Sequence, residues 1–182
     1  PPRGRALCLS PHPDDDVIGC GGTLALHRAQ GDAVRVVVAF DGALGLAPGV
    51  DPSVRCAEAL RAGQRLGVSD YVFLGHPEGH EPRTADLERG ATELRGPIAA
   101  WAPEVVYVPW MGEQHLDHRT LARVARRALA GFQGQVWGYA VWTPLGPARV
   151  VDVTSVWGRK LASLREHTSQ LERSGLEARM RG

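Results

Sequence analysis

Two short clusters of histidine and aspartate could do chemistry in this chain. The first, at residues 10–16 (SPHPDDD), follows an apolar run and holds one histidine and three consecutive carboxylates. The second, at residues 115–118 (HLDH), lies roughly a hundred residues later and has the same composition. Imidazole nitrogens and carboxylate oxygens are ligands that zinc takes in catalytic sites. Two such clusters, far apart in the sequence, therefore indicate one metal centre that the fold assembles.

The first cluster by itself supplies part of a ligand set. His12 and Asp15 are three residues apart in a turn, so both side chains can reach one point. One more histidine would complete the three protein ligands of a catalytic zinc site, which leaves a fourth position for water. His115 and His118 are the candidates, and Asp117 could orient an imidazole as its hydrogen-bond partner. An aspartate of the first cluster would remain free to act as a general base.

The composition is that of a soluble globular chain. Its 182 residues suffice for one domain with a full-sized core, and the hydrophobic (43%) and charged (23%) fractions are ordinary. The formal net charge of +1 gives no reason to expect a nucleic-acid or membrane partner. The 3 cysteines lack C-x-x-C spacing and favour reduced thiols in the cytoplasm. The first residue is proline, which leaves a processed start and a lost signal peptide open.

Strand and helix patterns alternate along the chain and would position both clusters. Strands are predicted over residues 6–10, 33–40, 71–74, 105–108, 135–141 and 150–153. Helices are predicted over about 19–30, 54–66, 84–101, 116–130 and 154–172. This alternation is typical of a three-layer, Rossmann-like α/β fold, with a mainly parallel sheet and helices on both faces, in a single domain over 1–182. Each cluster follows a strand, and ligands bind beyond strand ends in such sheets.

Several motifs appear in an order typical of one enzyme family. The two specific ones are PHPDD at 11–15, continued by GCGGTL at 19–24, and HxDH at 115–118. Supporting motifs are FDG at 40–42, RxxE at 55–58, LGV at 66–68, LGxP at 74–77, KLxxL at 160–164 and HxSQ at 167–170. Together they resemble the LmbE/PIG-L-like zinc-dependent N-acetylglucosaminyl deacetylases over nearly the whole chain.

The resemblance implies a metal site and a base. His12, Asp15 and His118 match the family's ligands for Zn²⁺, and Asp14 matches the general base that activates the attacking water. Spacing alone does not choose between Asp14 and Asp15 as the ligand, so that choice depends on the resemblance. The implied reaction is removal of the acetyl group from a small N-acetylglucosamine-type amino sugar or its conjugate.

The resemblance also implies roles for three further residues. His115, paired with Asp117, matches an imidazolium that stabilises the oxyanion of the tetrahedral intermediate. The Asp117 carboxylate is expected to raise the pKa of His115 and keep its ring charged near neutral pH. Arg55 matches a residue that grips polar groups of the sugar.

The chain departs from the family's usual pattern at several positions. Asp16 stands where Glu is common and is expected to support the turn, Leu116 stands where Pro is common, and Glu78 stands where Asp is frequent. His76 and His80 follow the third predicted strand. These two histidines could line the mouth of the substrate site or bind a second metal, although an ordinary solvated loop is favoured.

Two alternative functions stay open at this point. Asp14 and Asp16 after a strand also fit an aspartate-nucleophile, Mg²⁺-dependent phosphatase, but that class would leave the histidines unused and usually needs a lysine near the phosphate. Lys160, the only lysine, belongs to a late helix. A catalytically inactive metal- or sugar-binding domain would need neither Asp14 nor His115. The sequence specifies neither the sugar conjugate nor the oligomeric state, and a homo-oligomer is compatible with it.

Overall fold

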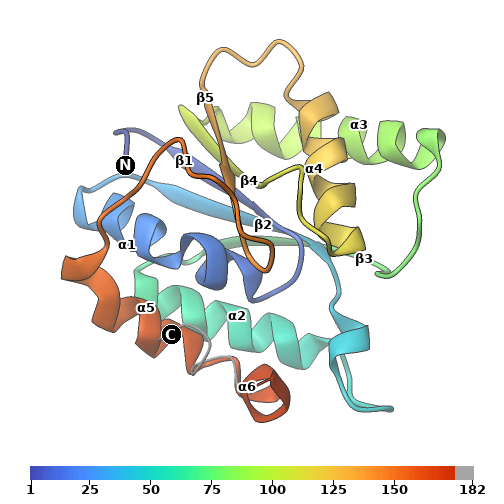
Figure 1. Ribbon diagram of the computed structural model, residues 1–182, viewed down its shortest axis with the longest axis horizontal. Helices are drawn as coiled ribbons and strands as arrows, with labels where there is room; N and C mark the ends of the chain where they lie inside the picture. The colour runs from blue at the N-terminus through green and yellow to red at the C-terminus, as the bar shows by residue number, and fades with distance from the viewer. Residues whose placement is uncertain (175–182) are drawn as a thin grey trace.

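A parallel β-sheet forms the centre of the computed structural model, which describes residues 1–174 (Figure 1). Its five strands run in the order β3-β2-β1-β4-β5, and each neighbouring pair is parallel. The strands are β1 (Ala6–Ser10), β2 (Val34–Phe40), β3 (Asp70–His76), β4 (Val105–Pro109) and β5 (Gln135–Tyr139). The predicted class of fold is therefore confirmed.

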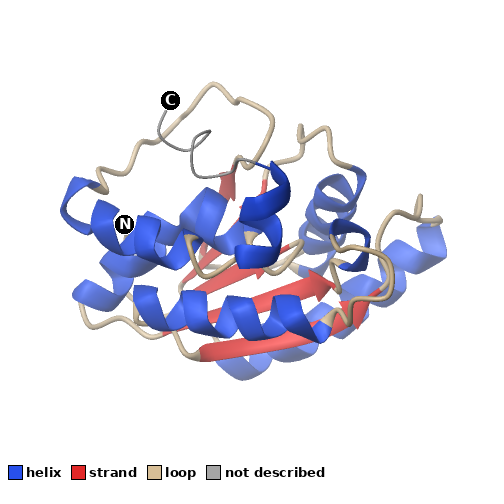
Figure 2. Cartoon of the chain, turned by 90° about the horizontal axis from the view of Figure 1, so that it is seen from below, coloured by secondary structure: helices blue, strands red, loops and turns tan. Residues whose placement is uncertain are grey.

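Helices cover both faces of this sheet (Figure 2). The α-helices are α1 (Gly21–Ala29), α2 (Ser53–Leu66), α3 (Thr84–Trp101), α4 (Leu116–Ala128), α5 (Trp157–Leu164) and α6 (Thr168–Ser174). One face carries α1, α2 and α5, and the other carries α3 and α4 (Figure 1). No helix in the described part of the chain has the length and apolar character needed to cross a bilayer.

The central strand β1 shows why the sequence folds into three layers. All of its residues are buried. Ala6 and Cys8 belong to the hydrophobic cluster beneath α1, α2 and α5, whereas Leu7 and Leu9 belong to the cluster beneath α3 and α4. Because successive side chains of a strand point to opposite faces, a strand that is covered on both faces needs a continuous apolar run.

The strand order places both chemical clusters at one point of the sheet. From β1 the chain proceeds outward to β2 and β3, and then crosses back to β4 and β5 on the other side of β1. The loops after β1 and β4 therefore lead away from a shared crevice, which is the position where open α/β sheets bind ligands. His12 follows β1 directly, and His115 follows β4 after a short loop.

Two predicted elements near the C-terminal end are wrong. Residues 150–153 form no strand, because they pair with no neighbour and Val153 packs instead against Gly22 of α1. The helix predicted over 154–172 is divided into a 3-10 turn (Thr154–Val156), α5 and α6. The break between α5 and α6 turns His167 inward, where its ring is buried. Residue spacing alone could not show that this histidine leaves the helix.

Candidate metal and active site

The three consecutive aspartates after β1 have three different partners. Ser10 Oγ donates to the His12 carbonyl (2.7 Å) and accepts from the Asp16 N–H (2.9 Å), which closes the turn. A short π-helix (Asp16–Cys20) then leads into α1. Because successive residues of a helical turn point in different directions, Asp14 faces Arg55, Asp15 faces two histidines and Asp16 enters the core.

Three buried residues form a group that can hold a metal ion. Asp15 Oδ2 lies 3.0 Å from His12 Nδ1 and 3.1 Å from His118 Nε2. The ligand atoms of the three residues all lie within 4.8 Å of one another. Burial favours a higher pKa for Asp15, but the His118 and His12 rings hold it well below its usual value. Two imidazoles and an ionised carboxylate are the donor set of a catalytic zinc site.

The surroundings of His118 support the same conclusion. Its ring is fully buried, and neither ring nitrogen has a hydrogen-bond partner among the described residues, despite the closeness of Asp15. A buried imidazole without partners is costly unless it has a ligand, so the residues fit a metal ion. The three predicted ligands are therefore brought together, and their role as ligands stays a prediction.

The opposite side of the His12 ring contacts two carboxylates. His12 Nε2 lies 3.0 Å from Glu78 Oε2 and 3.3 Å from Asp117 Oδ2. Burial lowers the pKa of His12, but hydrogen bonds with Asp117, Asp15 and Glu78 raise it well above its usual value. Sequence reasoning gave Glu78 no role. Glu78 nevertheless follows the carboxyl end of β3, and the same rule, that ligands bind beyond strand ends, had located the two clusters.

The candidate base, Asp14, is held by Arg55. Arg55 Nη2 donates to Asp14 Oδ1 (2.8 Å), and Nη1 donates to the Gly42 carbonyl (2.9 Å). Gly42 has a positive φ of 71°, and a Cβ there would lie 2.3 Å from Arg55 Nη1. Only glycine therefore allows the guanidinium this position. Arg55 is 4% exposed, so its main partner in this structure is Asp14.

His115 lies at the N-terminus of α4 and borders the site. Its Nδ1 accepts a hydrogen bond from the Asp117 N–H (3.3 Å), so the neutral ring carries its proton on Nε2. The Asp117 carboxylate oxygen Oδ2 lies 3.8 Å from His115 Nδ1. The same oxygen lies closer to His12 Nε2, at 3.3 Å. Burial and the His118 and His12 rings lower the pKa of His115, and Asp117 opposes them only in part. Asp117 therefore raises this pKa as expected, but burial and the two rings outweigh it, so the expectation that the His115 ring stays charged near neutral pH is wrong for this structure.

Asp16 and Glu113 are buried carboxylates that support the site from behind. Asp16 accepts a hydrogen bond from the Tyr71 hydroxyl (2.7 Å), and burial raises the pKa of Asp16 to about 7. Glu113 accepts backbone hydrogen bonds from residues 141–143, and its Oε2 lies 3.8 Å from His118 Nδ1. Sequence reasoning missed Glu113, and its position just before the HxDH motif was the only signal.

Six of the seven predicted site residues line one cavity of about 420 Å³, and these are His12, Asp14, Asp15, Arg55, His115 and Asp117. The seventh, His118, is buried behind Asp15. Glu78, Trp142 and Gln170 also line this cavity. Metal ligands, a carboxylate base and a half-exposed imidazole thus share one space, which is the arrangement that hydrolysis by an activated water requires.

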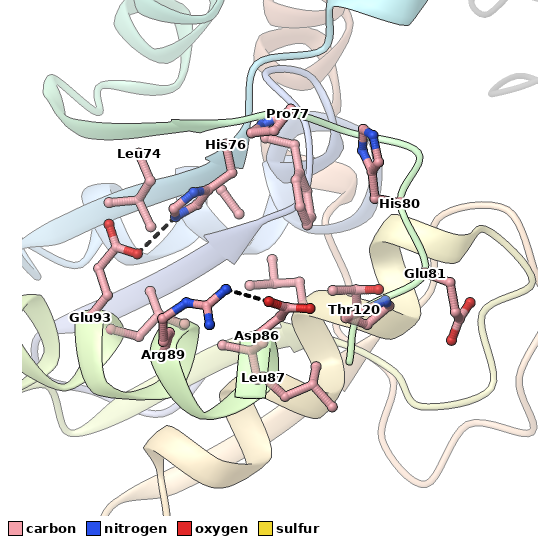
Figure 3. Close-up of a pocket in the computed structure, with 17 residues that line it drawn as sticks. Leu74, His76, Pro77, His80, Glu81, Asp86, Leu87, Arg89, Glu93 and Thr120 are labelled. Atoms are coloured by element: carbon pink, nitrogen blue, oxygen red, sulfur yellow. Dashed lines mark hydrogen bonds and ion pairs between the residues drawn. The ribbon is translucent and has the colours of Figure 1, made fainter. Parts of the chain in front are cut away.

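His76 and His80 border a different cavity of about 430 Å³, between the loop after β3 and helices α3 and α4 (Figure 3). His76 points toward Glu93 of α3, with Nε2 2.8 Å from the carboxylate (Figure 3). Neither histidine is in a group with metal-binding geometry among residues 1–174, and neither lines the cavity of the predicted site. The proposed roles at the substrate mouth or in a second metal site therefore gain no support.

Comparison with known proteins finds a family whose model matches most of this chain. The family described as PIG-L, GlcNAc-PI de-N-acetylase, matches residues 7–129. A similar curated protein is the 1D-myo-inositol 2-acetamido-2-deoxy-alpha-D-glucopyranoside deacetylase of Streptomyces avermitilis, 32% identical over 156 residues, which cover 70% of this chain and 53% of that protein. The chain thus spans about half the length of this relative.

Two solved structures are similar over most of this chain. A conserved protein from Thermus thermophilus has a TM-score of 0.84 and 28% sequence identity, and the match covers 96% of this chain and 84% of that one. The N,N'-diacetylchitobiose deacetylase from Pyrococcus horikoshii has a TM-score of 0.82 and 26% identity, covering 97% of this chain and 75% of that one. The α/β fold is therefore shared with both.

Proposed function

Because the chain belongs to the PIG-L family, we propose that it is a metal-dependent hydrolase that removes the acetyl group from an N-acetylglucosamine-type amino sugar or its conjugate. The observation that carries this proposal is the buried group of His12, Asp15 and His118 beside a cavity that also holds Asp14 and His115. A cavity of about 420 Å³ is in the range of small-molecule sites.

We propose that the metal is zinc and that His12, Asp15 and His118 hold it. When bound, it would supply Lewis-acid chemistry, which polarises an amide carbonyl and makes water more acidic. The donor set supports this choice, because two imidazoles and one carboxylate suit zinc better than Mg²⁺ or Ca²⁺, which prefer oxygen ligands.

The protein's own groups would divide the reaction between them. Asp14 takes a proton from the attacking water, whose oxygen adds to the acetyl carbon. His115 donates from Nε2–H to the carbonyl oxygen as negative charge develops there. The C–N bond then breaks, and the amine takes from Asp14 the proton that Asp14 received from the water. Acetate and the free amino sugar leave.

Arg55 would act in two ways in this scheme. Its ion pair with Asp14 holds the base in one orientation, and its guanidinium borders the cavity where the polar groups of a sugar would lie. A base held in one orientation accelerates the reaction more than a mobile one, because the base and the water must lie within hydrogen-bond distance of each other.

The phosphatase alternative is disfavoured by two contacts. Asp16 is fully buried against Tyr71 and does not line the cavity, so it cannot share a metal with Asp14 there. Lys160 donates its Nζ to the Ile18 carbonyl (2.8 Å) and is therefore held away from any phosphate in that cavity. An inactive binding domain would explain neither Asp14 nor His115 at the cavity wall.

We also propose a cytoplasmic location, supported by Cys8, Cys20 and Cys56, which are all free thiols in this structure. Cysteines without disulfides are typical of proteins in a reducing compartment. A homo-oligomer stays a prediction, which sedimentation of the purified chain would test.

The activity is tested by acetate release from a panel of N-acetylglucosamine conjugates with zinc present. We expect Asp14→Asn to keep its zinc and to lower kcat/KM by about 100-fold or more, because the base contributes about 10²–10⁴-fold. Asp152→Asn, which changes an exposed aspartate outside the cavity, is the matched control. Near-normal turnover by Asp14→Asn would require another base, and Mg²⁺-dependent phosphate release without acetate would favour the phosphatase.

A further inference from the structure

Glu78 is a buried carboxylate at the site that takes no part in the proposed reaction. It is 8% exposed and comes from the loop after β3. One oxygen, Oε2, lies 3.0 Å from His12 Nε2, and the other accepts a hydrogen bond from the Leu44 N–H. Both carboxylate oxygens are thus engaged, one at the candidate metal ligand and one at a neighbouring loop.

The two nitrogens of His12 face opposite surroundings. Nδ1 points to Asp15 within the candidate ligand group, and Nε2 points away from it to Glu78. A histidine that binds a metal through one nitrogen donates its other N–H to an acceptor, and that acceptor fixes the tautomer and the ring orientation. An anionic acceptor also makes the metal-binding nitrogen a stronger donor.

We propose that Glu78 is a positioning residue for His12, which works beside the Asp117 hydrogen bond to hold the His12 Nδ1 lone pair toward the metal and to strengthen it as a ligand. This inference rests on the proposed function, because it requires a metal held by His12, Asp15 and His118. It assigns a role to a residue that touches neither the substrate nor the metal in the proposed mechanism.

Asp117 also contacts this nitrogen, and His12 Nε2 forms a hydrogen bond with Asp117 Oδ2 (3.3 Å). Glu78 Oε2 lies nearer to the nitrogen, at 3.0 Å, and Asp117 Oδ1 accepts the Gly79 N–H (3.0 Å). The Asp117 N–H is donated to His115. Asp117 therefore ties the loop after β3 to α4, while Glu78 makes the shorter contact with the ring.

The loop that carries Glu78 is fixed on both sides of it. The His76 carbonyl accepts from the Asp41 N–H (2.9 Å), and the Gly79 N–H donates to Asp117. Gly79 has a positive φ of 80°, a conformation that glycine adopts without strain. A side chain between two anchored points loses little further freedom when it contacts His12, so the contact is well suited to help orient the ring.

Two substitutions separate the charge of Glu78 from its polar contact with His12. Glu78→Gln keeps an acceptor near His12 but loses the negative charge, and Glu78→Ala removes both. Glu81→Gln is the matched control, because its side chain is 70% exposed and its contact is a distant one with Arg123 (3.5 Å). Zinc affinity is measured by competition with a chromogenic chelator, and the Tm of each metal-free protein shows whether its fold is intact.

We expect Glu78→Ala to weaken zinc binding by about 10–100-fold, the usual effect of losing such a partner. Glu78→Gln should weaken it less, and Glu81→Gln should stay within about twofold of the unaltered chain. At saturating Co²⁺, Glu78→Gln should also change the visible absorption of the bound metal, because the donor strength of His12 changes. A merely structural role would not move that spectrum. If the metal-free Glu78→Ala protein is unstable, the zinc affinity and the Co²⁺ spectrum of Glu78→Gln decide whether Glu78 positions His12.

The outcomes distinguish this inference from the proposed function. If zinc affinity and the Co²⁺ spectrum stay unchanged in the Glu78 variants, Asp117 alone positions His12, and the inference is overturned. The proposed function would still stand if the unaltered chain releases acetate in a zinc-dependent reaction. An unaltered chain that binds no zinc would overturn both proposals together.

Discussion

At the scale of residues, neighbours of one type acquire different chemistry from their surroundings. Asp14 pairs with an arginine at the wall of the cavity, Asp15 lies between two imidazoles, and Asp16 is buried against a tyrosine. The Asp15 carboxylate is ionised because its two imidazole partners outweigh burial, whereas burial raises the pKa of Asp16 to about 7. Separate roles for three adjacent carboxylates therefore follow from separate partners.

The ligand assignment leads to a prediction for His118. We expect His118→Ala to lose most of its bound zinc, because it removes one of only three protein ligands and leaves a buried cavity. Metal analysis of protein purified without chelator measures this loss. His76→Ala, which alters a histidine outside the group, should keep its zinc. Full zinc occupancy in His118→Ala would show that the ligand set is different.

At the scale of elements, a buried histidine joins α1 to β4. His27 of α1 is fully buried, with Nδ1 2.8 Å from Asp32 and Nε2 2.9 Å from the Tyr107 hydroxyl of β4. A neutral ring satisfies both contacts, because it donates to Asp32 and accepts from Tyr107. Burial lowers the pKa of His27 below its usual value, although Asp32 opposes this.

This contact predicts a pH dependence of stability. As the pH falls below about 6.5, the unfolded chain binds a proton at His27 before the folded chain does, so the free energy of unfolding decreases. Within that window the loss is up to about 1.4 kcal/mol per pH unit. Urea unfolding with excess chelator at pH 7.5 and 5.5 should show a smaller loss in His27→Gln than in the unaltered chain.

His76→Gln provides the control for this experiment, since that ring is partly exposed beside Glu93. It should leave the pH dependence as in the unaltered chain. An equal loss of stability in His27→Gln and in the unaltered chain would mean that other groups, such as the buried His167, account for the effect.

At the scale of the whole molecule, the candidate metal site joins distant parts of the chain. His12 and Asp15 follow β1 at the centre of the sheet, and His118 belongs to α4 on one face of it. An ion bound there would link these elements in the folded state only, and ligands that bind only the folded state stabilise it. The single-domain organisation stays a prediction.

We therefore expect removal of the metal to lower the Tm. At free zinc about 100 times the Kd, binding adds about 2.7 kcal/mol. Each kcal/mol raises the Tm of a domain of this size by about 2–4 °C. Scanning calorimetry with and without a chelator should thus show a difference of about 5 °C or more. His118→Ala should show little difference, and a comparable shift in that variant would place the stabilising ion elsewhere.

The sequence by itself determined the fold class, and it predicted most of the residues that the structure brings together at the cavity. The bounds of β1 and α3 and the end of α2 were predicted correctly, because apolar runs and helical spacing are local properties. The strand ends pointed to the two clusters, since each strand end of a parallel sheet meets the same edge, whereas Arg55 and the choice of ligands came from the family resemblance.

Only the tertiary structure decided which of these residues touch. It placed Arg55 on Asp14, brought Glu78 to His12, and turned 150–153 away from the sheet. These contacts join loops that are far apart in the chain, and their distances depend on how every intervening element packs. The type and spacing of a residue indicate which chemistry it could perform. Its charge and orientation depend on the partner that packing brings to it, and no local sequence pattern encodes that packing.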